Sequence, residues 1–130
     1  MAFRFLIVDD SPAMRTVVHR VLSMTGVPIA QCHEAANGRE ALDLLHTQFF
    51  DVILTDLNMP VMDGEEFVAS LQAEETLRHI PVVIVSSAQT ELRAKRLLAL
   101  GARGFVKKPF LPETLREQLL QVLGVHHANQ

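Results

Sequence analysis

A run of strand-forming residues ends abruptly at a carboxylate in residues 52–60, which read VILTDLNMP. Val52 to Thr55 predict a buried strand, and Pro60 cannot continue it because proline offers no backbone donor. Asp56 therefore lies at the carboxyl end of a buried strand, where an ionised carboxylate is unfavourable unless another group pairs with it. The organisation of the whole chain depends on which groups lie beside Asp56.

Strand patterns of this kind alternate with helical patterns along the chain. We expect strands at residues 3–8, 29–35, 51–55, 80–86 and 104–106. Ser11 with Pro12 predicts one helix start. Asn37 and Asp63 predict two more, since each is followed by a glutamate three residues later. Helices are also expected from about Thr90 to Gly101 and from Pro112 onward.

The apolar strands predict an α/β fold with a parallel sheet. Strands that are apolar on both faces are typical of a parallel sheet between two helix layers. Right-handed connections leave few arrangements, and we predict a doubly wound five-stranded sheet in the flavodoxin-like order 2-1-3-4-5, with five helices on both faces. In such sheets ligands bind where the strand order reverses, here beyond the first and third strands.

Composition limits the class of protein. A chain of 130 residues suits one domain, which we place at residues 1–124, and we expect residues 125–130 to be a disordered tail. The net charge of −3 argues against nucleic-acid or membrane binding. The single cysteine, Cys32, favours a reducing compartment and is expected to pack as a small strand hydrophobe. Residues 5–8 are too short for a signal peptide or membrane span, so we expect a cytoplasmic protein.

Polar residues follow the predicted strands at a single sheet edge. They are Asp9 and Asp10, Asp56, Ser86 with Ser87, and Lys108. Three carboxylates repel one another, whereas Lys108 and one divalent cation would balance their charge. Carboxylate oxygens without histidine or cysteine favour Mg²⁺ over zinc. Carboxylate, hydroxyl, lysine and Mg²⁺ are typical of phosphoryl transfer, in which a carboxylate can be the nucleophile.

In this order along the chain, these motifs resemble the receiver domain of two-component response regulators, the CheY-like family. The resemblance covers about residues 3–124 and rests on Asp9-Asp10, on the DLNMP stretch at Asp56 with Asp63-Gly64, and on Lys108-Pro109-Phe110. It implies that Asp56 accepts a phosphoryl group from the phosphohistidine of a histidine kinase or phosphotransfer protein. It also implies that Lys108 contacts this group and that the Lys108–Pro109 peptide is cis.

The resemblance further implies a metal site and a switch. Asp10, Asp56 and the backbone carbonyl of Asn58 would bind Mg²⁺ directly, with Asp9 acting mainly through water. Spacing back from Lys108 places the phosphate-sensing hydroxyl at Ser86 rather than Ser87. The aromatic switch position falls on Phe105, which has no hydroxyl and could equally be a core residue. Asn58 and Ala88 resemble positions that tune dephosphorylation.

The fourth helix carries more leucines than one narrow stripe requires, so it is either deeply packed or partly an exposed docking face. In the family, the fourth helix, fifth strand and fifth helix form the surface read by a downstream protein partner. We expect a monomer or a weak phosphorylation-dependent dimer. Such a switch modifies only itself and is not a turnover enzyme. The sequence leaves open a stand-alone regulator and a receiver excised from a larger regulator or hybrid kinase.

Other functions fit less well. A pseudo-receiver, which binds partners without phosphorylation, is the main alternative, although every expected acidic, hydroxyl and basic position is filled. A haloacid-dehalogenase-like phosphatase would need an aspartate at the position of Asn58. A flavodoxin-like electron carrier would need a hydroxyl-rich phosphate loop where Asp9 and Asp10 stand. The chain lacks the glycine motifs of nucleotide enzymes.

Overall fold

Strands and helices alternate along the chain in the computed structural model, which describes residues 1–124. The predicted disorder of residues 125–130 lies outside the described residues. The elements are β1 (Phe3–Val8), α1 (Pro12–Ser23), β2 (Ile29–Ala35), α2 (Gly38–Leu45), β3 (Val52–Thr55), α3 (Gly64–Ala73), β4 (Val82–Ser86), α4 (Glu91–Leu100), β5 (Gly104–Lys107) and α5 (Pro112–Leu123).

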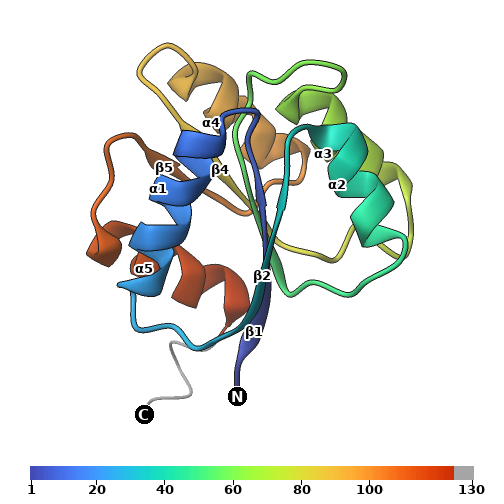
Figure 1. Cartoon of the computed structure of the whole chain (residues 1–130). Helices are drawn as coiled ribbons and strands as arrows, with labels where there is room; N and C mark the ends of the chain where they lie inside the picture. The colour runs from blue at the N-terminus through green and yellow to red at the C-terminus, as the bar shows by residue number, and fades with distance from the viewer. Residues whose placement is uncertain (125–130) are drawn as a thin grey trace.

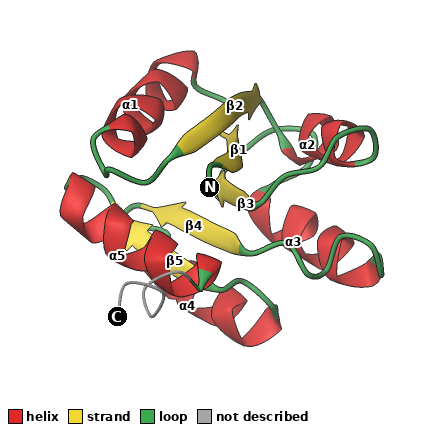
Figure 2. Cartoon of the chain, turned by 90° about the horizontal axis from the view of Figure 1, so that it is seen from below, coloured by secondary structure: helices red, strands yellow, loops and turns green. Residues whose placement is uncertain are grey.

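The strands form one parallel sheet in the order β2-β1-β3-β4-β5, which confirms the predicted topology (Figure 1). Helices α1 and α5 cover one face, and α2, α3 and α4 cover the other (Figure 2). The strand order reverses between β1 and β3, where Val8 pairs with Thr55. The residues that follow these two strands, Asp9 and Asp56, are therefore brought together.

Alternate residues of each strand supply two separate cores. On β4, Val82 and Ile84 face the α2, α3 and α4 layer, while Val83 and Val85 face α1 and α5. All of these side chains are buried, as the continuous apolar runs predicted. Burial on both faces fixes the strands in place, so the loops at their carboxyl ends start from rigid positions.

Side-chain caps begin three of the helices where the sequence predicts them. The Ser11 side chain accepts a hydrogen bond from the Met14 backbone amide at the start of α1. Asp63 and Glu66 form a complete capping box at α3. At α2, Asn37 accepts from the Glu40 amide, but the Glu40 carboxylate accepts from Ala36 rather than from the Asn37 backbone.

Several predicted boundaries were wrong in detail. β4 begins at Val82 rather than Ile80, because Pro81 has no backbone donor for the ladder. β3 begins one residue late, at Val52, and β5 continues to Lys107.

The leucines of α4 do not share one environment. Leu97 is buried, whereas Leu92 and Leu100 are 63% and 66% exposed. Deep packing of the whole helix, one of the two alternatives left open, is therefore wrong. Within residues 1–124, none of the helices is long and apolar enough to cross a bilayer.

Candidate functional site

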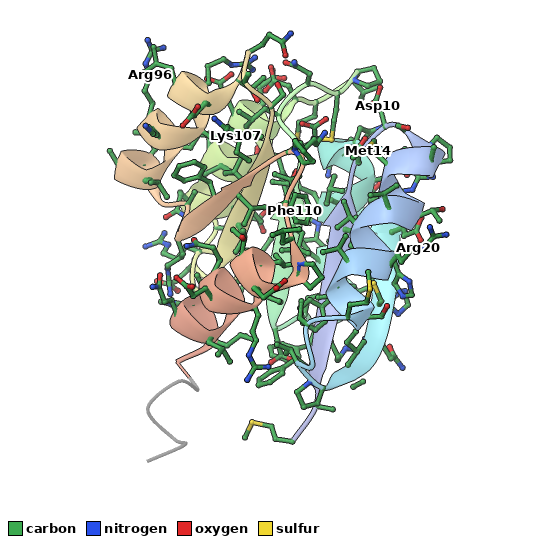
Figure 3. The ribbon with its side chains drawn as sticks, turned by 90° about the vertical axis from the view of Figure 1, so that its left-hand side faces the viewer. Asp10, Met14, Arg20, Arg96, Lys107 and Phe110 are labelled. Atoms are coloured by element: carbon green, nitrogen blue, oxygen red, sulfur yellow. The ribbon has the colours of Figure 1, made fainter. Side chains whose placement is uncertain are left out.

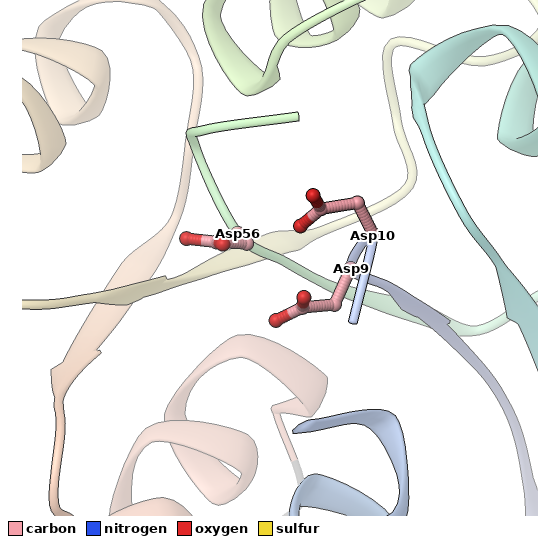
Figure 4. Close-up of side chains that lie close together, drawn as sticks. All are labelled: Asp9, Asp10 and Asp56. Carbon is pink, nitrogen blue, oxygen red and sulfur yellow. The ribbon is translucent and has the colours of Figure 1, made fainter. Parts of the chain in front are cut away.

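Three carboxylates meet at the point where the strand order reverses. Asp9 and Asp10 follow β1 and Asp56 follows β3, and one oxygen from each lies within 4.8 Å of the others (Figure 4). Within residues 1–124, this is the only group of three or more acidic, histidine or cysteine side chains close enough to share one ion. Asp9 is 3% exposed, Asp56 is half-buried and Asp10 is exposed.

Backbone amides hold one carboxylate oxygen of Asp9 and one of Asp56. The Ser11 amide donates to Asp9 Oδ1 at 2.9 Å, and the Leu57 amide donates to Asp56 Oδ1 at 2.8 Å. The other oxygens, Asp9 Oδ2 and Asp56 Oδ2, are the ones nearest to Lys108. Each carboxylate is thus oriented by one oxygen, and its second oxygen faces the shared site.

Lys108 is the only basic side chain of residues 1–124 that forms an ion pair with these carboxylates. Its Nζ lies 3.9 Å from Asp9 Oδ2 and 4.0 Å from Asp56 Oδ2. Burial is the main cause of the raised pKa of Asp9. The hydrogen bond from the Ser11 amide and the charge of Lys108 lower this pKa, whereas the charges of Asp56 and Asp10 raise it. One ammonium among three carboxylates leaves the site with a surplus of negative charge.

The donor set fits a magnesium ion. Three carboxylates with no histidine or cysteine among them offer only hard oxygen ligands. Mg²⁺ needs one or two direct carboxylates and keeps several waters, so the exposed Asp10 and the half-buried Asp56 suit it. A divalent cation would also offset the charge that Lys108 leaves uncompensated.

Gly64 allows the loop after Asp56 to fold closely onto the start of α3. A Cβ atom at residue 64 would lie 2.5 Å from the Asp56 carbonyl oxygen and 2.8 Å from the Leu57 Cα. The Gly64 amide also donates to the Leu57 carbonyl at 2.8 Å. Because both obstructing atoms belong to the backbone, a larger residue would displace the loop that carries Asp56 and Asn58.

The two serines that follow one another at the end of β4 have different partners. Ser86 is fully buried, and its hydroxyl donates to the Val106 carbonyl over a long 3.4 Å. The Ser87 hydroxyl lies 3.2 Å from Thr90 Oγ1, in the turn that starts α4. The Lys108 amide donates to the Ser86 carbonyl at 2.7 Å, and the Lys108–Pro109 peptide is cis. The β4 and β5 ends are thereby joined, with Ser86 beside the backbone of Lys108.

Phe105 and Asn58 occupy the surroundings of the site. Phe105 is half-buried and packs against the core layer of α2, α3 and α4. Ser86 falls on the same face of the sheet, because Ile84 is the strand partner of Phe105 and side chains alternate along β4. Asn58 is exposed, and its side-chain oxygen accepts a hydrogen bond from Arg93. The assigned roles of Ser86, Phe105 and Asn58 stay predictions.

Sequence reasoning missed two arginines at the edge of the site. Arg15 donates to the Asp9 carbonyl at 2.6 Å and pairs with Glu34 at 2.7 Å. Arg93 on α4 contacts both Asn58 and Glu65. Neither arginine belongs to a local motif, so only the contact between distant segments identifies them.

The cysteine and the histidines of residues 1–124 do not join the acidic cluster. His46 pairs with Glu74, and His33 packs edge-on against Phe50. Burial and then Glu34 raise the pKa of the Cys32 thiol to about 11, which agrees with a packing role. His126 and His127 lie outside the described residues.

Comparison with known proteins identifies the family. The family model of the response regulator receiver domain matches residues 5–120. A chemotaxis protein CheY from Pseudomonas aeruginosa is 34% identical over 119 residues, which cover 92% of this chain and 94% of that protein.

Solved structures agree with this comparison. The chemotaxis response regulator CheY4 of Vibrio cholerae superimposes with a TM-score of 0.79 at 36% identity, covering 95% of this chain and all of that one. The receiver domain of a sensor histidine kinase from Pseudomonas aeruginosa has a TM-score of 0.81 at 26% identity, covers 95% of this chain and 99% of that one, and holds a magnesium ion in its active site cleft. The acidic cluster, the strand order and these matches agree, and the chain belongs to the response regulator receiver domain family, with the CheY-like fold of two-component signalling proteins.

Proposed function

We propose that this chain is a phospho-acceptor switch in which Asp56 takes a phosphoryl group from the phosphohistidine of a histidine kinase or phosphotransfer protein. The observation that carries the proposal is the convergence of Asp9, Asp10 and Asp56 within 4.8 Å, beside Lys108. The switch phosphorylates and dephosphorylates only itself.

The two oxygens of Asp56 take different roles. Oδ1 accepts the Leu57 amide, so Oδ2 is the oxygen left to attack phosphorus. The Asp56 O–P bond forms as the N–P bond of the donor breaks, and the departing imidazole nitrogen keeps the electron pair and takes up a proton. Lys108 then pairs with a phosphoryl oxygen.

Residues at the sheet edge would hold Mg²⁺. Asp10, Asp56 and the Asn58 carbonyl are the direct ligands we propose, with Asp9 acting mainly through water. When bound, Mg²⁺ neutralises the negative charge of the incoming phosphoryl oxygens. The burial of Asp9 supports its indirect role, because it keeps this carboxylate behind the other two.

Ser86 and Phe105 would convert phosphorylation into a change of surface. A charge-assisted hydrogen bond is worth about 1.5–3 kcal/mol. A shift from 1:99 to 99:1 needs about 5.5 kcal/mol, so Lys108 and the metal must also contribute, or the active state is already partly populated. We propose that the Ser86 hydroxyl leaves the Val106 carbonyl for the phosphoryl group and that Phe105 fills the vacated space.

The output surface that we propose is formed by α4, β5 and α5. The exposed Leu92 and Leu100 supply apolar area on α4 that a protein partner can bury. Figure 3 shows Lys107 on this side of the molecule, next to the β5 ribbon. Phosphorylation would change the affinity of this surface for its partner.

Intact mass spectrometry tests the proposal directly. The protein is incubated with Mg²⁺ and acetyl phosphate, with Asp56→Asn as the matched variant. We expect one added phosphoryl group in the wild type and none in the variant or in the presence of a chelator. No addition to the wild type would favour the pseudo-receiver.

A second variant tests the sensing hydroxyl. Ser86→Ala removes only the Oγ atom, so we expect Asp56 still to be phosphorylated. The phosphorylation-linked change in hydrogen exchange of α4 should fall by about tenfold or more, the equivalent of one charge-assisted bond. Ser87→Ala is the control, and an equal response in both variants would refute the assignment to Ser86.

A further inference from the structure

Arg93 joins three segments that are distant in sequence. It projects from α4, and its Nε and Nη2 donate to Glu65 Oε1 on α3 at 2.9 and 2.5 Å. Its Nη1 donates to Asn58 Oδ1, in the loop after β3, at 2.8 Å. The loop that leaves Asp56 is thus tied to both α3 and α4 by one guanidinium group.

The geometry of this contact orients the Asn58 side chain. Glu65 engages one edge of the planar guanidinium, which fixes its plane and directs Nη1 toward Asn58. Arginine offers only donors, so the amide oxygen of Asn58 must face it and the amide NH₂ is left to donate elsewhere. The Arg93 side chain is 31% exposed and that of Glu65 is 41% exposed, so this ion pair is partly shielded from water, whereas the Arg93–Asn58 hydrogen bond is exposed.

Asn58 is connected to Asp56, the proposed phospho-acceptor, by a short stretch of backbone. It follows Asp56 by two residues. The amide of the intervening Leu57 donates to Asp56 Oδ1, and the Leu57 carbonyl accepts from the Gly64 amide. Ala88, in the turn between β4 and α4, has no polar side-chain group that could donate to Asn58. Arg93, five residues further along, provides that group from the first turns of α4.

We propose that Arg93 is a positioning residue for the phospho-acceptor site, which holds the Asn58 side chain at its edge and limits the access of water to phosphorylated Asp56. This inference rests on the proposed function. It adds a direct polar connection between the acceptor loop and α4, separate from Ser86 and Phe105. Loss of Arg93 frees Asn58 and removes a large side chain, so water should reach the acyl phosphate more easily.

The experiment has one readout before phosphorylation and one after it. In the metal-free protein, we expect Arg93→Ala to raise amide hydrogen exchange about threefold or more in residues 58–62 and 91–94. After phosphorylation with acetyl phosphate and removal of the donor, intact mass should show Asp56 dephosphorylating about threefold faster than in the wild type. Unchanged exchange, or a lifetime within 1.5-fold of the wild type, would overturn the proposal.

Matched variants separate position from charge. Arg96→Ala removes the same charge from the same helix, and Arg96 makes no hydrogen bond or ion pair with residues 1–124. In Figure 3 Arg96 points outward from α4. We expect Arg96→Ala to match the wild type in hydrogen exchange and in the lifetime of phosphorylated Asp56. Arg93→Lys keeps the charge without the planar fork and should resemble Arg93→Ala. An effect of Arg96→Ala as large as that of Arg93→Ala would assign the change to net charge.

A double-mutant cycle tests whether Arg93 acts through Asn58. In an Asn58→Ala background, we expect Arg93→Ala to change the lifetime by less than 1.5-fold. A full threefold effect in that background would refute the route through Asn58. If the wild type is not phosphorylated at all, the proposed function fails, and the inference fails with it; phosphorylation with an unaltered lifetime refutes the inference alone.

Discussion

Aspartates stand at both ends of β3, and their surroundings differ. Asp51 precedes the strand, and its carboxylate accepts the Arg4 amide at 2.8 Å while its own amide donates to the Arg4 carbonyl at 2.8 Å. Asp56 follows the strand and lies among two other carboxylates, with one ammonium 4.0 Å away. Asp51 thus has hydrogen-bonding partners within the fold, whereas the negative charge around Asp56 is only partly compensated.

A hollow lies at the end with the paired aspartate. A cavity of about 550 Å³ lies there, lined by residues that include His46, Phe49, Asp51 and Leu77. Arg4 also donates to the Phe49 carbonyl at this end, so its polar groups have partners within the fold. The comparison teaches that a hollow whose polar groups are paired offers no reactive group, whereas the uncompensated charge at the other end marks the candidate site.

The largest expected difference between the two ends of β3 is in the rate of phosphorylation when each carboxylate is removed in turn. Asp56→Asn should reduce phosphorylation by acetyl phosphate by more than about 100-fold, because the nucleophile is lost. Asp51→Asn should change it by less than about twofold, because this end makes no contact with the acceptor. Intact mass over time measures both rates. An equal loss of phosphorylation in the two variants would show that the two ends do not differ in this function.

The free energy of unfolding should depend more on Asp51 than on Asp56, the reverse of the order expected for phosphorylation. Asp51→Ala leaves the part-buried Arg4 amide without its acceptor, so we expect the free energy of unfolding to fall by about 2 kcal/mol. Asp56→Asn removes like-charge repulsion and should raise it. Urea denaturation without metal measures both changes. Asp43→Ala, at an exposed carboxylate, is the control, and a larger loss in Asp56→Asn than in Asp51→Ala would contradict the assignment.

Magnesium should stabilise the wild type through the acidic end alone. At a concentration tenfold above its dissociation constant, a bound ion adds about 1.4 kcal/mol of stability. Asp10→Asn removes one proposed ligand, so its melting temperature should be higher than that of the wild type in chelator and should rise less when Mg²⁺ is added. The same Mg²⁺ response in wild type and Asp10→Asn would exclude Asp10 as a ligand.

The smallest effect is expected at the large cavity. Phe49 is 65% exposed beside it, so Phe49→Ala should change the unfolding free energy by less than about 0.5 kcal/mol. Phosphorylation kinetics should stay within about twofold of the wild type. A tenfold change in phosphorylation would show that this end communicates with the acceptor.

Local patterns predicted most of the fold. The alternation of strands and helices, the caps at Ser11, Asn37 and Asp63, and the parallel order could be inferred because each depends on neighbouring residues or on general rules of connection. The meeting of Asp9 with Asp56 also followed, since parallel strands place their carboxyl ends at one edge. The start of β4 was placed two residues too early, because the apolar run extends to Ile80 although Pro81 has no backbone donor for the ladder.

The sequence by itself determined that acidic, hydroxyl and lysine groups gather at one edge of a parallel sheet, because strand order converts sequence position into spatial position. Only the tertiary structure decided which side chains then touch. Arg93 and Asn58 are 35 residues apart, and Arg4 and Asp51 are 47 apart. Their contacts depend on the rotation of each helix and on side-chain rotamers, which are set by packing between elements and not by any local pattern.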